Sequence, residues 1–368
     1  MNKVELQHRL NEIFQHLHEN PEVSWQEYNT TAYIGKFLEE EGISYKVFDD
    51  CPGVIAEMGS GKPVIAIRGD MDALWQEVDG EFKANHSCGH DAHMTIVMGL
   101  ILQLKNETWQ NGTVRFIFQP AEEKGSGALK MVEKGVVDDA DFLFGIHLRP
   151  VEEVPLGQAA PSIRHGAADF LEAHIYGNDA HGARPHQGVN AIDVMSMINI
   201  GLKNIWFSPQ QSYSVKMTRC QAGGENINII PGNGHFALDA RAESNSLLEE
   251  LKKKTEHVIQ SAESMGVKVS YEWVDFVPGA VVSDEAEQFL RKGILHTYGE
   301  AGCAASLRTA GSDDFHYYTV KRPHLKAAML GLGANLKPGL HHPHMTFDHA
   351  CLMDGVEILK NTVLEALR

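Results

Sequence analysis

Residues 114–147 read VRFIFQPAEEKGSGALKMVEKGVVDDADFLFGIH, and this stretch decides the fold class. An apolar run of strand length at residues 114–118 precedes a helical pattern at residues 128–134, and a second apolar run follows at residues 142–147. Strands that alternate with helices are typical of a layered α/β domain with a largely parallel sheet. We therefore expect an α/β layer built around this stretch.

The same alternation continues toward both ends of the chain. Strands and helices with these patterns are expected at residues 4–17, 29–41, 54–58, 64–68, 92–104, 283–298, 325–332 and 349–367. The middle of the chain has a different order, β-α-β-β-α-β, which describes a ferredoxin-like unit. Its strands are expected at residues 170–176, 214–220, 235–241 and 268–274. Its helices are expected at residues 191–206 and from a capping box at Ser246 and Glu249 to Gly266.

These patterns predict a discontinuous domain and an inserted one. Residues 1–166 and 278–368 form an α/β domain whose mixed, mostly parallel sheet is flanked by helices. Residues 167–277 form a ferredoxin-like α+β domain inserted into it. The chain length of 368 residues agrees with two domains, because single cores rarely grow to this size.

Composition and charge argue against several classes of protein. Hydrophobic residues make up 43% of the chain and charged residues 22%, as in globular proteins, and the net charge is −17. An acidic chain repels nucleic acids and anionic lipid surfaces, and no apolar stretch is long enough to span a bilayer. The five cysteines form no CxxC pair, and the first residues contain no apolar secretion signal. We therefore expect a cytoplasmic protein without a disulfide framework.

The densest group of potentially reactive side chains is the run NHSCGHDAH at residues 85–93. A thiolate and an imidazole as close as Cys88 and His90 could bind a divalent cation. Cys-x-His alone is a weak pattern, and His86 and His93 of the same run can be explained as polar loop and helix residues. The interpretation of Cys88 and His90 as ligands therefore depends on further ligand types elsewhere in the chain.

Such residues recur at the ends of other predicted strands. Glu122 and Glu123 directly follow the strand at residues 114–118, where open α/β sheets place their active sites, although a solvated pair is the simpler explanation in isolation. Asp72 could fix a ligand imidazole or cap a turn. His147 could be a satisfied core histidine, and His341 belongs to a histidine-rich loop that could lie on the surface.

Taken together, these groups favour metal-assisted hydrolysis. Most of them end or follow apolar strands of one predicted sheet, so they should converge in space. They supply enough ligands for two metal ions and one spare carboxylate, as hydrolysis requires when metals acidify a water and a base moves its proton. The chain contains no Walker A, GxSxG or HExxH pattern, and no GxGxxG follows a strand.

The motifs RxDMDAL, HxCGHDxH, QPAEE, GxH, HGARPH, NxIP, DDF and LHxP occur along nearly the whole chain. With them the chain resembles the amidohydrolase branch of the aminoacylase and carboxypeptidase metallohydrolases. That branch includes hippurate hydrolases, indoleacetyl-amino-acid hydrolases and the bacterial AmhX-type enzymes. The resemblance implies cleavage of N-acyl amino acids to a carboxylic acid and a free amino acid. It also implies two divalent metal ions as cofactors, namely zinc, manganese, cobalt or nickel.

The resemblance also implies a role for individual residues. The implied metal ligands are Cys88, His90, Glu123, His147 and His341. The Cys88 thiolate would be shared by both ions, Glu122 would be the general acid and base, and Asp72 would support the ligands from behind. The inserted domain would be a lid that commonly mediates homodimerisation. In it, His181 would hold the oxyanion, and Asn228 and Arg241 would bind the substrate carboxylate.

Three stretches depart from the family pattern. Trp75 replaces the usual proline after Asp-Ala-Leu, which changes the pocket wall. Residues 178–180 replace a glycine-rich approach to His181, and Gly232 stands where an acidic residue commonly follows the proline. None of these changes removes a proposed ligand or the base.

Two other functions remain open on the sequence. A dipeptidase or carboxypeptidase could use the same dinuclear site, and a comparison of acylated amino acids with dipeptides would separate it. A non-catalytic metal- or ligand-binding protein could share the scaffold. Glu122 beside Glu123 argues against such a binder, because a binder needs no base.

Overall fold

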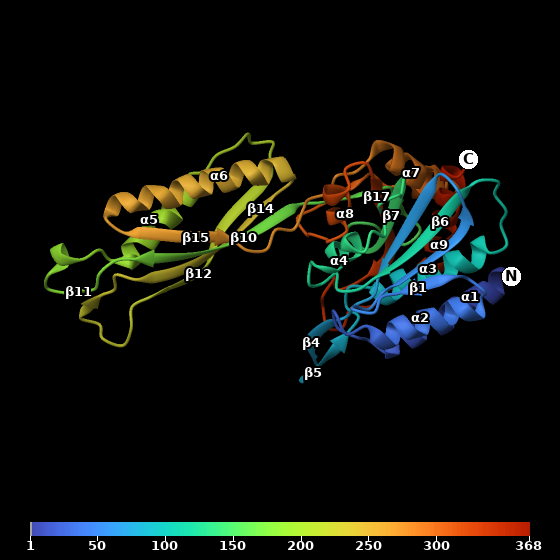
Figure 1. Cartoon of the computed structure of the whole chain (residues 1–368), viewed down its shortest axis with the longest axis horizontal. Helices are drawn as coiled ribbons and strands as arrows, with labels where there is room; N and C mark the ends of the chain where they lie inside the picture. The colour runs from blue at the N-terminus through green and yellow to red at the C-terminus, as the bar shows by residue number, and fades with distance from the viewer. Residues whose placement is uncertain (1) are drawn as a thin grey trace. The chain divides into compact units, whose positions relative to one another are not determined.

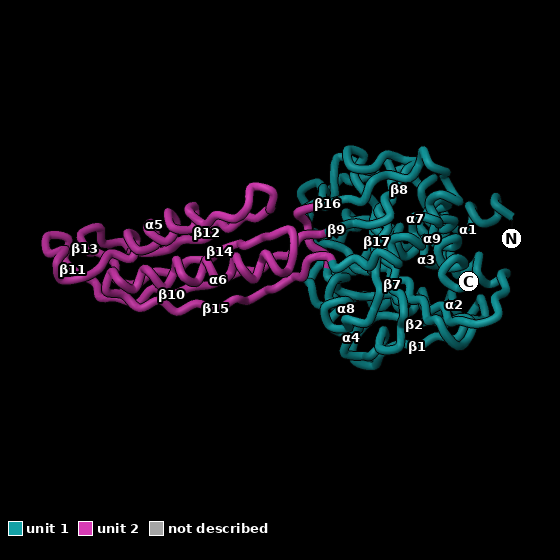
Figure 2. The backbone as a smooth tube through the Cα atoms, turned by 90° about the horizontal axis from the view of Figure 1, so that it is seen from above, with its two compact units in different colours: residues 1–164, 281–308, 314–368 teal, residues 165–280, 309–313 magenta. Residues whose placement is uncertain are grey.

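The computed structural model describes residues 2–368, which form two compact units (Figure 2). Met1, the first residue of the predicted segment 1–166, lies outside the described residues. The first unit comprises the described residues up to Arg164 together with Val281–Arg308 and Asp314–Arg368. The second comprises His165–Ala280 and Thr309–Asp313.

The short segment Thr309–Asp313 differs from the sequence-based assignment, which placed it in the first domain. In the structure the backbone N–H of Gly166 donates to the carbonyl oxygens of Thr309 at 3.0 Å and Gly311 at 3.2 Å. These hydrogen bonds join residues far apart in the chain, so no local pattern reveals them. The segment therefore packs within the second unit.

A seven-stranded mixed sheet forms the centre of the first unit (Figure 1). Its spatial order is β1 (Tyr45–Val47), β2 (Val54–Ser60), β6 (Gly112–Gln119), β3 (Val64–Asp70), β7 (Phe142–Pro150), β17 (Lys326–Leu336) and β8 (Ala159–Ala160). The four central strands, β6, β3, β7 and β17, pair in parallel, and the outer strands pair antiparallel. Strands β3 and β6 are buried along their whole length, which explains their continuous apolar sequences. The predicted α/β class with a mixed sheet is confirmed.

Helices cover the sheet of the first unit. The larger ones are α1 (Lys3–Glu19), α2 (Tyr28–Glu40), α3 (His90–Leu104), α7 (Asp284–Tyr298) and α9 (Ala350–Ala366). Helix α3 is buried on nearly all sides, and Gly99 lets it approach Leu10 of α1 and Val356 of α9 closely. Two shorter helices, α4 (Gly127–Glu133) and α8 (His316–Lys321), pack against each other.

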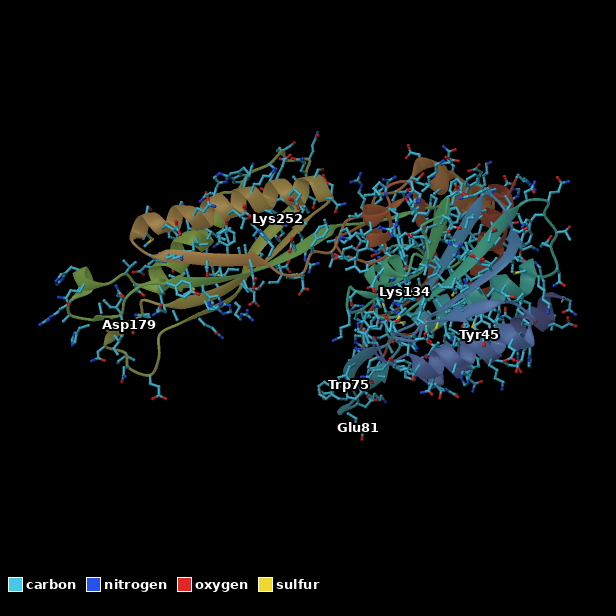
Figure 3. The ribbon with its side chains drawn as sticks, viewed as in Figure 1. Tyr45, Trp75, Glu81, Lys134, Asp179 and Lys252 are labelled. Carbon is cyan, nitrogen blue, oxygen red and sulfur yellow. The ribbon has the colours of Figure 1, made fainter. Side chains whose placement is uncertain are left out.

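One hairpin of the first unit has no counterpart in the sequence prediction. It consists of β4 (Leu74–Val78) and β5 (Glu81–Asn85), joined by Asp79 and Gly80 at φ +56° and +86°, as in a type I′ turn. Its strands are short and largely exposed, so they give no hydrophobic period. Trp75 and Glu81 are labelled on this hairpin in Figure 3. Trp75, which replaces the family's proline, is 64% exposed there.

The second unit is an antiparallel four-stranded sheet with helices α5 (Ala191–Leu202) and α6 (Asn245–Ser261) packed on it. The strand order is β12 (Tyr213–Ala222), β14 (Gly234–Ala242), β10 (Ala167–Tyr176) and β15 (Lys268–Trp273). With the chain order β-α-β-β-α-β, this is the expected ferredoxin-like topology, and the unit has its own hydrophobic core.

Two details of the second unit's helices differ from the prediction. The residue that caps α6 is Ser244, whose Oγ accepts the N–H of Leu247 at 3.2 Å, and not Ser246. Helix α5 ends at Leu202, four residues earlier than the apolar sequence suggested. The remaining short strands are β9 (Ile163–His165), β11 (Ala180–His181), β13 (Ile229–Ile230) and β16 (Leu307–Thr309). Within residues 2–368, no helix combines the length and apolarity needed to cross a bilayer.

Candidate metal centre

The predicted ligands of the first unit come from the carboxyl ends of its central strands. Glu122 and Glu123 follow β6, His147 lies near the end of β7, and His341 lies five residues after β17. Cys88 precedes helix α3, which starts at His90 after Gly89 at φ +89°. Parallel strands bring their carboxyl ends to one edge of a sheet, so these side chains can meet.

The structure brings all five predicted ligands and Glu122 into overlapping groups. In the first group, ligand atoms of Cys88, His90 and His147 lie within 4.8 Å of one another. A second group of the same tightness joins Cys88, Glu123 and His341, and a third joins His90, Glu122 and Glu123. Cys88 belongs to the first two groups, so its thiol lies between two potential cation positions.

Hydrogen bonds fix the orientation of two of these imidazoles. His90 donates its Nδ1–H to the carbonyl oxygen of Asp72 at 2.8 Å, and His147 donates its Nδ1–H to the carbonyl oxygen of Leu148 at 2.7 Å. Because carbonyl oxygens only accept, Nδ1 carries the proton in each ring, and in the neutral form Nε2 has the lone pair that a metal ion needs. The Nε2 atoms of His90 and His147 lie 3.8 Å from Glu122 Oε2 and 3.6 Å from Cys88 Sγ, respectively.

Two buried polar atoms support the fit of a cation. Among residues 2–368, His90 Nε2 and Glu123 Oε1 have no hydrogen-bond partner. Oxygens of Asp70, Glu122 and Glu123 lie 3.7, 3.8 and 4.0 Å from His90 Nε2, too far for hydrogen bonds. Buried polar atoms without partners are costly, and a cation would satisfy these two.

Distances between the potential ligand atoms also fit a metal site. Cys88 Sγ lies 3.6 Å from His147 Nε2, and His341 Nε2 lies 3.3 Å from Glu123 Oε1. Ligands at zinc bond lengths around a tetrahedral ion stand about 3.3–3.7 Å apart. The residues therefore match the donor set and the spacing of a site for divalent cations.

The protonation of these ligands depends on burial and charge. Burial and the nearby Glu123 carboxylate raise the pKa of the Cys88 thiol well above its usual value. Burial, together with His93, lowers the pKa of His147 well below its usual value, so this ring is neutral. The carboxylate of Glu123 raises the pKa of His341. A divalent cation favours the thiolate and neutral imidazole forms that ligation requires.

Asp72 holds the turn that carries the two glutamates. Its Oδ1 accepts the backbone N–H of Glu122 at 3.1 Å, and its Oδ2 accepts that of Glu123 at 3.0 Å. Ser24 donates its hydroxyl to the same Oδ2 at 2.6 Å. Burial opposes ionisation of Asp72, but His90, Ser24 and the backbone donors lower its pKa overall.

The sequence left two roles open for Asp72, fixing a ligand imidazole and capping a turn. His90 Nδ1 lies 2.8 Å from the Asp72 carbonyl oxygen and 3.3 Å from its Oδ1, and the carboxylate also accepts the N–H groups of the turn. The main chain of Asp72 therefore orients His90, whereas its side chain orients Glu122 and Glu123.

His93 belongs to a network behind the ligands and not to the ligand set. Its Nδ1–H donates to Asp70 Oδ1 at 2.7 Å, and its Nε2 accepts the backbone N–H of Leu148 at 3.0 Å. Both nitrogens are thus used, so His93 cannot coordinate a cation in this arrangement. Asp70 also binds Arg68, whose guanidinium opposes the effect of burial and helps to hold the pKa of Asp70 well below its usual value.

In the second unit, the three predicted residues do not form one group. His181 in β11 pairs with Ile229 in β13, and the carbonyl oxygen of Asn228 accepts the N–H of Gly182 at 2.7 Å. His181 and Asn228 are therefore neighbours. Arg241 lies near the far end of β14, about 23 Å along the strand from Gly234 at its start.

Arg241 already has a partner within its own unit. Its guanidinium binds the carboxylate of Asp239 with Nε–Oδ1 and Nη2–Oδ2 distances of 3.0 and 3.2 Å. His181 is exposed, and its Nδ1 accepts the N–H of Ala183 at 3.0 Å, which leaves the ring proton on Nε2.

Comparison with known proteins gives a consistent result over nearly the whole chain. Residues 66–365 match the family described as peptidase family M20/M25/M40. The chain is 31% identical over 357 residues to an IAA-amino acid hydrolase, ILR1-like 4, of Arabidopsis thaliana, covering 91% of this chain and 80% of that protein. It is 31% identical over 374 residues to an N-acetylcysteine deacetylase of Bacillus subtilis, covering 94% and 93%.

The solved structures agree with this match. A dinuclear metal-binding peptidase of the M20 family from Bacillus subtilis superposes with a TM-score of 0.84 and 28% identity, and the match covers 99% of both chains. The likeness thus includes both units of the fold as well as the sequence.

Proposed function

The chain belongs to peptidase family M20/M25/M40, and we propose on this basis that it releases a free amino acid and a carboxylic acid from an N-acyl amino acid. It is a hydrolase of amide bonds. The observation that carries the proposal is the overlap of two potential cation groups at Cys88 with Glu122 beside them. A spare carboxylate next to metal ligands is what amide hydrolysis requires.

The donor groups indicate how two divalent ions would be held. Cys88, His90 and His147 would hold one ion, and Cys88, Glu123 and His341 the other. When bound, such ions acidify water and polarise an amide carbonyl. The thiolate of Cys88 favours zinc, and manganese, cobalt and nickel also suit this donor set.

Glu122 is the proposed general acid and base. Its side chain is 11% exposed, its Oε2 lies 3.8 Å from His90 Nε2, and its backbone is fixed by Asp72. A carboxylate in this place takes a proton from the attacking water and later gives it to the leaving nitrogen. Asp72 acts as a positioning residue, since it contacts Glu122 and Glu123 through their N–H groups.

The second unit is proposed as a lid that supplies substrate contacts. His181 carries its ring proton on Nε2, so it can donate a hydrogen bond to an oxyanion. Asn228 and Arg241 are proposed to bind the carboxylate of the amino-acid part. A cationic group suits that anion, because the chain as a whole has a net charge of −17.

A homodimer through the second unit is part of the proposal. Strand β12 is an edge strand of its sheet, and such edges can pair with another chain. Helix α5 beside it exposes Ile192 and Ile200, which are 46% and 60% exposed. The proposed compartment is the cytoplasm, where thiols stay reduced, and all five cysteines are free in the structure.

The test is hydrolysis by metal-reconstituted protein of N-acetyl, N-benzoyl and longer N-acyl amino acids, compared with dipeptides that carry a free amine. We expect turnover of the acylated substrates and a ranking that identifies the acyl group. Preferential cleavage of dipeptides would favour a peptidase instead. No turnover with two ions bound would contradict the proposal and favour a non-catalytic binder.

A further inference from the structure

Glu27 is a fully buried carboxyl group that the proposed mechanism does not use. It occupies the N-cap position of helix α2, but its side chain makes no capping hydrogen bond. Instead, its Oε1 accepts the backbone N–H of Ala121, 94 residues further along the chain, at 2.7 Å. The side chain thus points from the helix start to the turn after β6.

Ala121 has an unusual backbone conformation. Its φ of +52° lies in the left-handed region, which is strained for a residue with a Cβ atom. Ala121 directly precedes Glu122 and Glu123, so its dihedral angles set the direction in which the chain presents both side chains. A strained residue persists only where surrounding contacts over-determine it.

Three consecutive N–H groups of this turn donate to oxygens of side-chain carboxyl groups. Ala121 donates to Glu27, and Glu122 and Glu123 donate to Asp72 at 3.1 and 3.0 Å. Successive N–H groups around a left-handed residue form a concave nest that favours acceptor oxygens. Glu27 and Asp72 therefore hold the turn from two sides.

The neighbouring Glu22 provides a matched comparison. Its carboxylate accepts the backbone N–H groups of Asn29 and Thr30 at 3.2 and 2.8 Å and the hydroxyl of Thr30 at 2.9 Å. These are the amides that an N-cap side chain usually satisfies. Glu22 thus caps α2 in place of Glu27, which leaves Glu27 available for the turn at Ala121.

From these contacts we infer that Glu27 is a positioning residue, which fixes the turn at Ala121 and thereby aims Glu122 at the substrate and Glu123 at the cation. This inference rests on the proposed function, because it assigns to the turn the same base and ligand. Glu27 acts through the backbone and touches neither substrate nor cation.

The test compares Glu27→Met, Glu27→Gln and Glu22→Met. Methionine keeps the length of glutamate and removes the acceptor, whereas glutamine keeps an acceptor oxygen. We expect kcat of Glu27→Met to fall about 10- to 100-fold while KM changes less than about threefold. Glu27→Gln should stay within about threefold of the wild type in both constants, because the hydrogen bond to Ala121 is retained.

Glu22→Met should separate positioning from folding. It loses the cap of α2, so its thermal midpoint should fall, but its kcat below that midpoint should equal the wild-type value. Wild-type kcat in Glu27→Met would overturn the inference. So would a Glu27→Gln variant as slow as Glu27→Met, since the acceptor alone would then not explain the effect.

A second readout does not depend on activity. Titration of the metal-free proteins with zinc should show about tenfold weaker binding of one ion in Glu27→Met and unchanged binding in Glu22→Met. If the wild type cleaves no N-acyl amino acid but this difference in zinc affinity is found, the proposed function fails and the positioning role stands. Equal zinc affinity in all variants would overturn the inference that Glu27 positions Glu123 for the cation through the turn at Ala121.

Discussion

At the carboxyl edge of the seven-stranded sheet, Glu122 and Glu123 are each 11% exposed and are held through their backbones by Asp72. In the second unit, His181 is exposed and its ring accepts the N–H of Ala183 in its own loop, and the guanidinium of Arg241 is bound by Asp239. The backbone of the first environment is thus fixed by buried side chains, whereas the side chains of the second are exposed or bound within their own unit. This difference agrees with the proposal that the first group performs the chemistry and the second contacts the substrate.

The largest effect is expected at the preorganised edge, for Glu122→Gln. The amide cannot accept a proton, so kcat should fall by about 10³-fold or more, while two ions per chain remain bound because Cys88, His90, Glu123, His147 and His341 are intact. Turnover of an N-acyl amino acid measures the loss of activity, and atomic absorption measures whether two ions per chain are still bound. Glu133→Gln, at an exposed glutamate paired with Lys130, is the control. An active, metal-replete Glu122→Gln would remove the proposed base.

His181→Ala tests the second unit. Loss of an oxyanion donor should lower kcat about 10²- to 10³-fold. Because His181 is exposed, the thermal midpoint of the variant should match that of the wild type. His186→Ala, at an exposed histidine of the same loop, should leave both quantities unchanged. Equal kcat in His181→Ala and the wild type would show that the second unit supplies no donor to the transition state.

The same contrast explains which parts the sequence could predict. Parallel strands buried on both faces, such as Val64–Asp70, have continuous apolar sequences, so the bounds of the four central strands were predicted to within four residues. The hairpin of β4 and β5 was missed because its strands are short and largely exposed and contain no continuous apolar run, although Asp79-Gly80 is a turn signal. The candidate metal ligands at strand ends could be identified from the sequence, because parallel strands end at the same edge of a sheet and bring such side chains together.

Asp72 was predicted as a supporting residue, but Ser24 and Glu27 could not be predicted from the sequence. Ser24 reaches Asp72 across 48 residues and Glu27 reaches Ala121 across 94, and neither contact leaves a local pattern. His90 and His93 share one helix face at i and i+3, and His90 was chosen as the ligand from its spacing to Cys88 and from the family resemblance. The structure supports this choice, because the backbone N–H of Leu148 donates to His93 Nε2 and leaves that nitrogen no lone pair for a cation.

A smaller effect is expected for Arg241→Ala. Loss of the guanidinium should raise KM for N-acyl amino acids about tenfold and leave kcat nearly unchanged, because the group it is proposed to bind is remote from the scissile bond. The matching N-acyl amino-acid amides lack the carboxylate, so their KM should not change. Asp239→Asn releases the guanidinium from its partner and should lower KM for the acids. Equal loss on acids and amides would assign Arg241 a structural role instead.

The smallest expected effect is a pH dependence of the free energy of unfolding, which arises from the buried carboxyl group of Glu27. Burial, with a contribution from the charge of Asp72, raises the pKa of Glu27 from 4.5 to about 8. Between these values the folded protein keeps a proton that the unfolded chain releases, so stability falls as pH rises, by up to about 1.4 kcal/mol per pH unit. Glu27→Gln cannot titrate and should lack this slope.

Urea unfolding of the metal-free wild type and Glu27→Gln at pH 5.5, 6.5 and 7.5 measures that difference. The stability of the wild type relative to the variant should decrease at each step, because the proton on Glu27 stabilises only the folded state. Glu22→Gln leaves the Glu27 carboxyl group and its hydrogen bond to Ala121 in place, so the stability of this variant should still fall as pH rises. Parallel curves for the wild type and Glu27→Gln would mean that Glu27 is ionised in the folded protein. The turn at Ala121 would then be held by a charged acceptor, and the edge would carry one more negative charge beside Asp72.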